Sequence, residues 1–230
     1  MGLSVGAAAR LARPGAGLLL DLDGTLVDSE PVHQAAFREY FIGRGWQVED
    51  AVIRLFSGRR AQEVFPTLAG PWAGEDPAVL PAAVIALELG SKLRPEPVAG
   101  AARLIAACAR AGLPAAVVTS AERDWTAYLL GLLDGSAMAM VTAEDCVRGK
   151  PDPEPFRRGA ELLGLRAGDL LAVEDSPAGI ASARGADVGH VIGVTTTHPE
   201  VVLLGAGAHE VVPDLCALAD AVEELSSSRR

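Results

Sequence analysis

Aromatic residues are scarce in this chain of 230 residues, where Phe, Trp and Tyr together make up 4%. The hydrophobic half of the sequence must therefore form its core mainly from Ala, Leu and Val. Cysteine is also rare: only Cys108, Cys146 and Cys216 occur, far apart and without CxxC spacing. This pattern indicates neither a disulfide framework nor a zinc site, and we expect buried structural thiols.

Long apolar runs are missing as well. The stretch 18–20 is followed at once by Asp21, so it is too short for a signal-peptide core or a membrane span. The formal net charge of −10 argues against a nucleic-acid partner, because proteins that bind a phosphate backbone are normally basic. We expect a cytoplasmic protein without a membrane or nucleic-acid partner.

Lysine is rare too, since of the 20 basic residues only Lys92 and Lys150 are lysine. The two cationic side chains are not interchangeable, because lysine is a compact ammonium on a flexible stem. A lysine kept at position 150 of an arginine-rich chain is therefore a candidate anion ligand; the alternative is a loop lysine without a role.

Apolar runs of strand length alternate with helical segments over most of the chain. Strands are predicted at 16–22, 113–120, 137–143, 169–175, 189–195 and 209–215, and helices at 98–112, 121–132, 151–164, 177–186 and 214–225. This alternation predicts an α/β fold with a parallel, Rossmann-like sheet that is covered by helices on both faces.

Residues 31–97 contain no clear strand run. Helices are predicted there at 31–44, 49–56, 60–69 and 76–93, separated by glycine-containing breaks. We therefore predict two domains: a core at 1–30 and 98–230, and an inserted α-helical cap at 31–97.

Polar residues that carry chemistry follow four of the predicted core strands. Asp21 and Asp23 end the first strand, and paired carboxylates at a strand end can hold Mg²⁺ through oxygen ligands, attack phosphorus and transfer a proton. Two solvated loop acids are the alternative. Thr119 follows the second strand and could bind a phosphate oxygen beside a helix start, or act only as an N-cap.

Lys150 follows the third of these strands, where its ammonium could neutralise a phosphoryl group. Glu174 and Asp175 end the fourth, a buried strand, which suits a metal site better than a core. Each signal is weak alone. Because the carboxyl ends of parallel strands share one edge, the ordered set predicts a single site there.

The motifs DLDGTLVDSE (21–30), GKPDP (149–153) and VEDSPAG (173–179), with a hydroxyl residue between the first two, resemble the haloacid dehalogenase superfamily of aspartyl-phosphate phosphotransferases. The similarity extends from residue 16 to about residue 212. It implies a Rossmann-like core with a helical cap inserted after the first motif, and it implies Mg²⁺ as cofactor.

The resemblance also implies roles for single residues. Asp21 is then the nucleophile and a metal ligand, and Asp23 is the acid and base that also gives its backbone carbonyl to the metal. Thr119, Ser120 and Lys150 then hold the phosphate. Asp175 and Glu174 complete the acidic metal site. The second aspartate of the first motif favours phosphate chemistry over dehalogenation.

Three residues of the predicted cap are candidates for substrate contact: His33, Arg59 and Arg60. The alternatives are a histidine that packs in a helix and arginines at a solvated helix start. The family's sugar-phosphate mutases, such as β-phosphoglucomutase, also have a histidine at this place. Their cap arginine, however, corresponds to Ala61 here, and the stretch SGRRA is more similar to sugar phosphatases.

These observations favour a Mg²⁺-dependent phosphatase that hydrolyses small phosphomonoesters, above all sugar phosphates, through an aspartyl-phosphate intermediate. The expected partner is a small phosphorylated metabolite, and the expected state is a monomer. A phosphomutase of the β-phosphoglucomutase type is the nearest alternative. A non-catalytic binding module is disfavoured, because no motif residue is missing.

Overall fold

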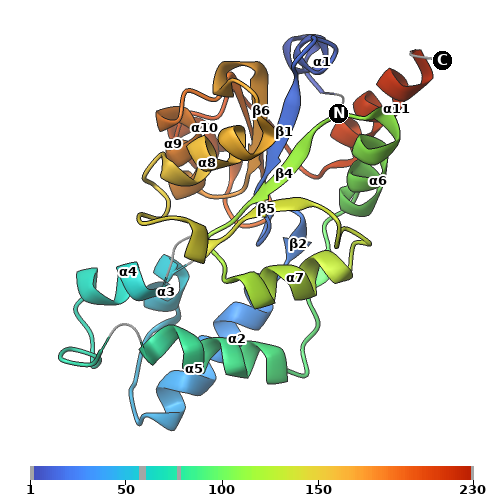
Figure 1. Cartoon of the computed structure of the whole chain (residues 1–230). Helices are drawn as coiled ribbons and strands as arrows, with labels where there is room; N and C mark the ends of the chain where they lie inside the picture. The colour runs from blue at the N-terminus through green and yellow to red at the C-terminus, as the bar shows by residue number, and fades with distance from the viewer. Residues whose placement is uncertain (1–2, 57–60, 77–78, 229–230) are drawn as a thin grey trace.

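The computed structural model describes residues 3–56, 61–76 and 79–228. Its core is a parallel sheet of six strands in the order β5-β4-β1-β6-β7-β8, which confirms the predicted α/β fold (Figure 1). The strands are β1 Gly17–Leu20, β4 Ala115–Val118, β5 Ala139–Val141, β6 Leu170–Glu174, β7 His190–Val194 and β8 Glu210–Val212.

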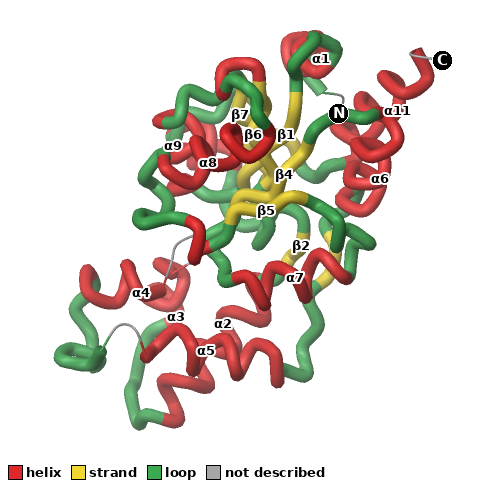
Figure 2. Tube along the Cα trace, in the orientation of Figure 1, coloured by secondary structure: helices red, strands yellow, loops and turns green. Residues whose placement is uncertain are grey.

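Helices cover both faces of this sheet (Figure 2). Two buried hydrophobic clusters lie on the two faces of the sheet. In β1, Leu18 and Leu20 belong to the first cluster and Leu19 to the second, because successive side chains of a strand point to opposite faces. The first cluster includes residues of α1, α6, α7 and α11, and the second includes residues of α8, α9 and α10. The helices are α1 Val5–Leu11, α6 Ala101–Ala111, α7 Arg123–Gly131, α8 Glu154–Leu163, α9 Pro177–Gly185, α10 Glu200–Gly205 and α11 Cys216–Ser228, with short turns η3 Ala143–Asp145 and η4 Ala167–Asp169.

Between β2 (Val27–Asp28) and β3 (Glu96–Pro97) the described chain is helical; we call residues 29–95 the helical insert. Its elements are α2 Glu30–Gly43, α3 Asp50–Ile53, η1 Arg54–Phe56, α4 Ala61–Val64, η2 Phe65–Thr67 and α5 Val79–Gly90. The insert has a hydrophobic cluster of its own, where the rings of Phe41 and Trp72 stack at 5.4 Å. Strands β2 and β3 pair antiparallel where the chain enters and leaves the insert.

Several local features differ from the sequence prediction. Helices α1 and α10 and the β2–β3 pair were not predicted. Helix α8 begins at Glu154 rather than Pro151, because the Asp152 side chain accepts a hydrogen bond from the Glu154 amide at 2.9 Å and closes a turn first. The three cysteines, all in the described part of the chain, form no disulfide; Cys108 and Cys146 are buried and Cys216 is partly buried. Among the described residues, no helix is both long and apolar enough to cross a membrane.

Candidate active site

Two neighbouring strands bring the predicted acids together at one edge of the sheet. Leu20 of β1 pairs with Val173 of β6, and the Asp21 amide donates to the Val173 carbonyl at 3.0 Å. Asp21 and Glu174 therefore end adjacent strands, and Asp175 follows directly. All three acids are buried.

Lys150 contributes a buried ammonium to this cluster. Its Nζ lies 2.5 Å from Asp21 Oδ1 and 2.6 Å from Glu174 Oε1, and the residue is 1% exposed. Burial alone would lower the pKa of Lys150, but the charges of the two carboxylates outweigh burial and raise it. The lysine is thus held as a cation between the two strand ends.

Oxygen atoms of Asp21, Glu174 and Asp175 all lie within 4.8 Å of one another. Burial, opposed by the Lys150 charge, raises the pKa of Asp21 to about 7. Burial and the charges of Glu174 and Asp21 raise the pKa of Asp175 well above its ordinary value. Three carboxyls facing one ammonium form an all-oxygen site with excess negative charge, which is what a hard divalent cation neutralises.

Two glycines let these acids approach the backbone. A side chain at Gly179 would overlap the Glu174 carboxylate, whose Oε2 accepts hydrogen bonds from the Ser176 amide at 2.8 Å and hydroxyl at 2.9 Å. Gly24 has a φ of +80° and would likewise collide with Asp175. Because both Glu174 oxygens already have protein partners, Asp21 and Asp175 are the better placed pair to contact a cation.

Asp23 has a different environment from the three clustered acids. Its Oδ1 accepts hydrogen bonds from Ser29 Oγ at 2.6 Å, His33 Nε2 at 2.9 Å and Trp125 Nε1 at 2.9 Å. Burial raises the pKa of Asp23, but the His33 charge and these donors outweigh burial and lower it. The carboxylate is therefore fixed and ionised.

His33 connects Asp23 to the helical insert. Its Nδ1 lies 2.6 Å from Oε1 of Glu88, a residue of α5 that is only 7% exposed. Burial lowers the pKa of His33, but the charges of Glu88 and Asp23 raise it well above its ordinary value. An imidazolium donates from both ring nitrogens, so one histidine bridges two carboxylates.

A cavity opens beside these residues, between the sheet edge and the insert. Thr119 and Ser120 line it together with Asp21, Asp23, His33 and Asp175. Thr119 is not the N-cap of α7, which is Glu122; its hydroxyl instead accepts from the Ala121 amide at 3.0 Å. The insert contributes mainly apolar lining: Phe37, Ile53, Phe56, Val84 and Ile85.

The predicted cap residues Arg59 and Arg60 lie outside the described residues. Other residues of the site were not predicted. Sequence reasoning missed Glu88, Trp125 and the Thr25 hydroxyl, which lies 3.4 Å from Asp175 Oδ1. For Glu88 a signal existed: it is the single charged residue in the apolar run AVIALELG, and buried acids are rare unless they are paired.

The chain is similar in sequence to known hydrolases. A family model described as "Hydrolase: haloacid dehalogenase-like hydrolase" matches residues 16–187. The validoxylamine A 7'-phosphate phosphatase of Streptomyces hygroscopicus is 35% identical over 191 residues, which cover 82% of this chain and 89% of the relative. The hexitol phosphatase A of Escherichia coli is 36% identical over 183 residues, covering 77% and 82%.

Solved structures agree on the fold. A hydrolase from Pseudomonas syringae matches with a TM-score of 0.81 at 23% identity, covering 91% of this chain and 98% of that one. The CbbY protein of Rhodobacter sphaeroides, solved in complex with phosphate, matches with a TM-score of 0.75 at 24% identity, covering 90% and 96%.

Proposed function

Because the chain belongs to the haloacid dehalogenase-like hydrolases, we propose that it is a Mg²⁺-dependent phosphatase of small phosphomonoesters, chiefly sugar phosphates. The observation that carries the proposal is the contact of Lys150 with both Asp21 and Glu174 beside Asp175, at the wall of a cavity that also includes Thr119. The names of the two relatives, phosphatases of validoxylamine phosphate and of hexitol phosphate, support this substrate class.

In the proposed reaction, a carboxylate oxygen of Asp21 attacks phosphorus. The bond from phosphorus to the leaving oxygen breaks, and Asp23 transfers to that oxygen a proton that the hydrogen-bonded His33 imidazolium supplies to the ionised carboxylate. A water molecule then gives its proton to Asp23 and attacks the aspartyl phosphate, which frees Asp21 and releases inorganic phosphate. Thr119, Ser120 and Lys150 bind the phosphoryl oxygens throughout.

The buried acids Asp21, Glu174 and Asp175 suit a hard divalent cation. Asp21 and Asp175 would hold Mg²⁺ with the Asp23 backbone carbonyl, while Glu174 fixes Lys150. The ion supplies charge that removes the repulsion between an anionic nucleophile and an anionic ester. The helical insert corresponds to the cap predicted at residues 31–97, and in this proposal it acts as a cap domain that excludes water from the cavity.

A phosphate-release screen tests the function. The purified chain is incubated with hexitol phosphates, hexose 6-phosphates, β-glucose 1-phosphate and glycerol 1-phosphate, each with Mg²⁺ and with EDTA. We expect release that requires Mg²⁺ and that falls by at least about a thousandfold in Asp21→Asn, as loss of a nucleophile does.

Two outcomes would contradict the proposal. Conversion of β-glucose 1-phosphate to glucose 6-phosphate without free phosphate would identify the phosphomutase instead. Near-normal turnover by Asp21→Asn, or no release from any ester with Mg²⁺ present, would remove the assignment of the nucleophile or of the activity.

A further inference from the structure

The loop that carries Lys150 has no regular secondary structure to hold it. Residues 146–153 lie between η3 and α8 and belong to neither a helix nor a strand. Lys150 nevertheless has to place its Nζ within 2.6 Å of carboxylates on two different strands. The position of its backbone must therefore come from contacts with other segments.

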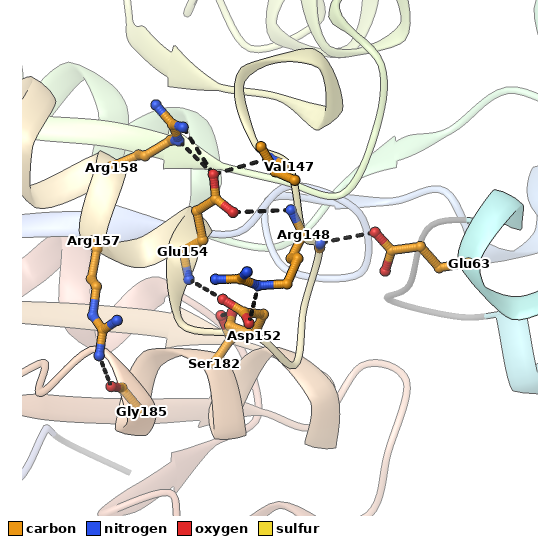
Figure 3. Close-up of polar contacts among 10 residues, drawn as sticks. Glu63, Val147, Arg148, Asp152, Glu154, Arg157, Arg158, Ser182 and Gly185 are labelled. Carbon is orange, nitrogen blue, oxygen red and sulfur yellow. Dashed lines mark hydrogen bonds and ion pairs between the residues drawn. The ribbon is translucent and has the colours of Figure 1, made fainter.

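Three successive backbone amides ahead of Lys150 donate to glutamate side chains (Figure 3). The amides of Val147 and Arg148 donate to Glu154 Oε1 and Oε2, both at 3.0 Å. The amide of Gly149 donates to Glu63 Oε1 at 2.9 Å. Carboxylates form stronger hydrogen bonds with amides than neutral acceptors do, so these contacts fix the loop.

The two glutamates come from different parts of the fold. Glu154 begins α8 and is close in sequence, whereas Glu63 belongs to α4 of the helical insert, 86 residues before Gly149. Figure 3 shows Glu63 reaching the loop from the side opposite to Glu154. Burial changes along the same loop: Val147 is 80% exposed, while Gly149 and Lys150 are buried.

We propose that Glu63 is a positioning residue of the helical insert that holds the Lys150 loop in register with Asp21 and Glu174. The Glu63 contact falls on the amide directly before Lys150, so its loss frees the residue whose side chain must reach both strands. Glu154 cannot replace it, because both of its oxygens already accept from Val147 and Arg148. The expected effect of Glu63 on catalysis rests on the role of Lys150 in the proposed function. The effect of Glu63 on the position of Lys150 does not depend on that function.

The scarcity of lysine provides a direct readout. With Lys92 and Lys150 as the two lysines, protein grown with ¹³Cε,¹⁵Nζ-lysine gives two side-chain NMR signals, and Lys92→Arg assigns them. We expect Glu63→Ala to move the Lys150 signal and leave that of Lys92 in place. Glu63→Gln keeps an acceptor oxygen for the Gly149 amide, so its Lys150 signal should stay close to that of the wild type.

Steady-state kinetics with a substrate from the phosphate-release screen complete the test. Glu63→Ala should lower kcat about tenfold with a smaller change in KM, as expected for loss of one charge-assisted hydrogen bond. Glu63→Gln, which keeps an acceptor oxygen, should have most of the wild-type kcat. The matched control is Glu75→Ala, which breaks a pair with Arg44 inside the insert and should change neither kcat nor the Lys150 signal.

The outcomes separate the two proposals. An unmoved Lys150 signal in Glu63→Ala overturns the positioning role, and so does an equal shift in Glu75→Ala or in Glu63→Gln. If the wild type releases phosphate from no ester, the proposed function fails, while the NMR comparison still decides the role of Glu63.

Discussion

His33 Nδ1 lies 2.6 Å from Glu88 Oε1, and this contact joins helices α2 and α5 of the insert directly behind Asp23. The other ring nitrogen of His33 lies 2.9 Å from Asp23 Oδ1. The orientation of Asp23, the proposed acid and base, therefore depends on a carboxylate that is distant in sequence and that sequence reasoning did not identify.

Glu88→Gln should show whether the charge of Glu88, and not only its packing, holds His33 against Asp23. The neutral side chain has nearly the same shape but no longer stabilises the imidazolium, so the His33 ring is held less firmly against Asp23. We expect kcat to fall about tenfold, with KM changed less, as for loss of one charge-assisted contact. Phosphate-release kinetics measure the effect.

Glu75→Gln is the control for Glu88→Gln, since Glu75 lies in the same insert and pairs with the exposed Arg44. Its kinetics should match those of the wild type. Equal losses in both variants would assign the effect to the stability of the insert, and a fully active Glu88→Gln would remove the positioning role.

The sequence predicted the part of the site that the sheet alone determines. Asp21, Glu174 and Asp175 follow strands whose buried runs are plain, and parallel strands place their carboxyl ends together. Glu88 and Glu63 could not be placed this way, because each lies on an insert helix whose rotation and position depend on packing that the core does not specify. The turn before α8 was missed for a related reason: the Asp152 side chain, not the helix pattern, sets its start.

Mg²⁺ binding should be visible in thermal unfolding, independently of any substrate. The clustered carboxyls repel one another, so a bound cation stabilises the folded state, by about 2.7 kcal/mol at a hundredfold excess over Kd. We expect Mg²⁺ to raise the Tm of the wild type and to leave that of Asp175→Asn unchanged.

Asp134→Asn is the matched control for the Mg²⁺ titration. Asp134 is an exposed residue with a φ of +53°, a conformation that asparagine also tolerates. Its Tm should rise with Mg²⁺ as in the wild type. A rise of the same size in Asp175→Asn would move the metal away from Asp175.

Gly179→Ala tests how closely α9 packs on the strand ends. The added methyl group would overlap the Glu174 carboxylate, so the acid must move and weaken its contact with Lys150. We expect the free energy of unfolding to fall by about 1–3 kcal/mol, as overpacking of a buried position typically does. Gly131→Ala, where a methyl group meets nothing within 4 Å, should unfold like the wild type in urea. Equal stability of the two variants would contradict the predicted overlap.

Low pH should weaken the hydrogen bonds by which the Glu154 carboxylate holds the Lys150 loop. Hydrogen bonds from the Val147 and Arg148 amides and from the Arg158 side chain lower the pKa of Glu154 from 4.5 to about 2. A carboxyl whose pKa is lowered by folding stabilises the protein above its ordinary pKa, and this contribution is lost as the pH falls toward the lowered value.

Glu154→Gln lacks the charge at every pH. The wild type should therefore be more stable than Glu154→Gln at pH 6, and the difference should shrink steadily between about pH 5 and pH 3. Urea unfolding of both proteins at each pH measures it, since all other titrating groups are shared and cancel in the difference. A gap that stays constant or widens in acid would show that the Glu154 charge does not hold these amides.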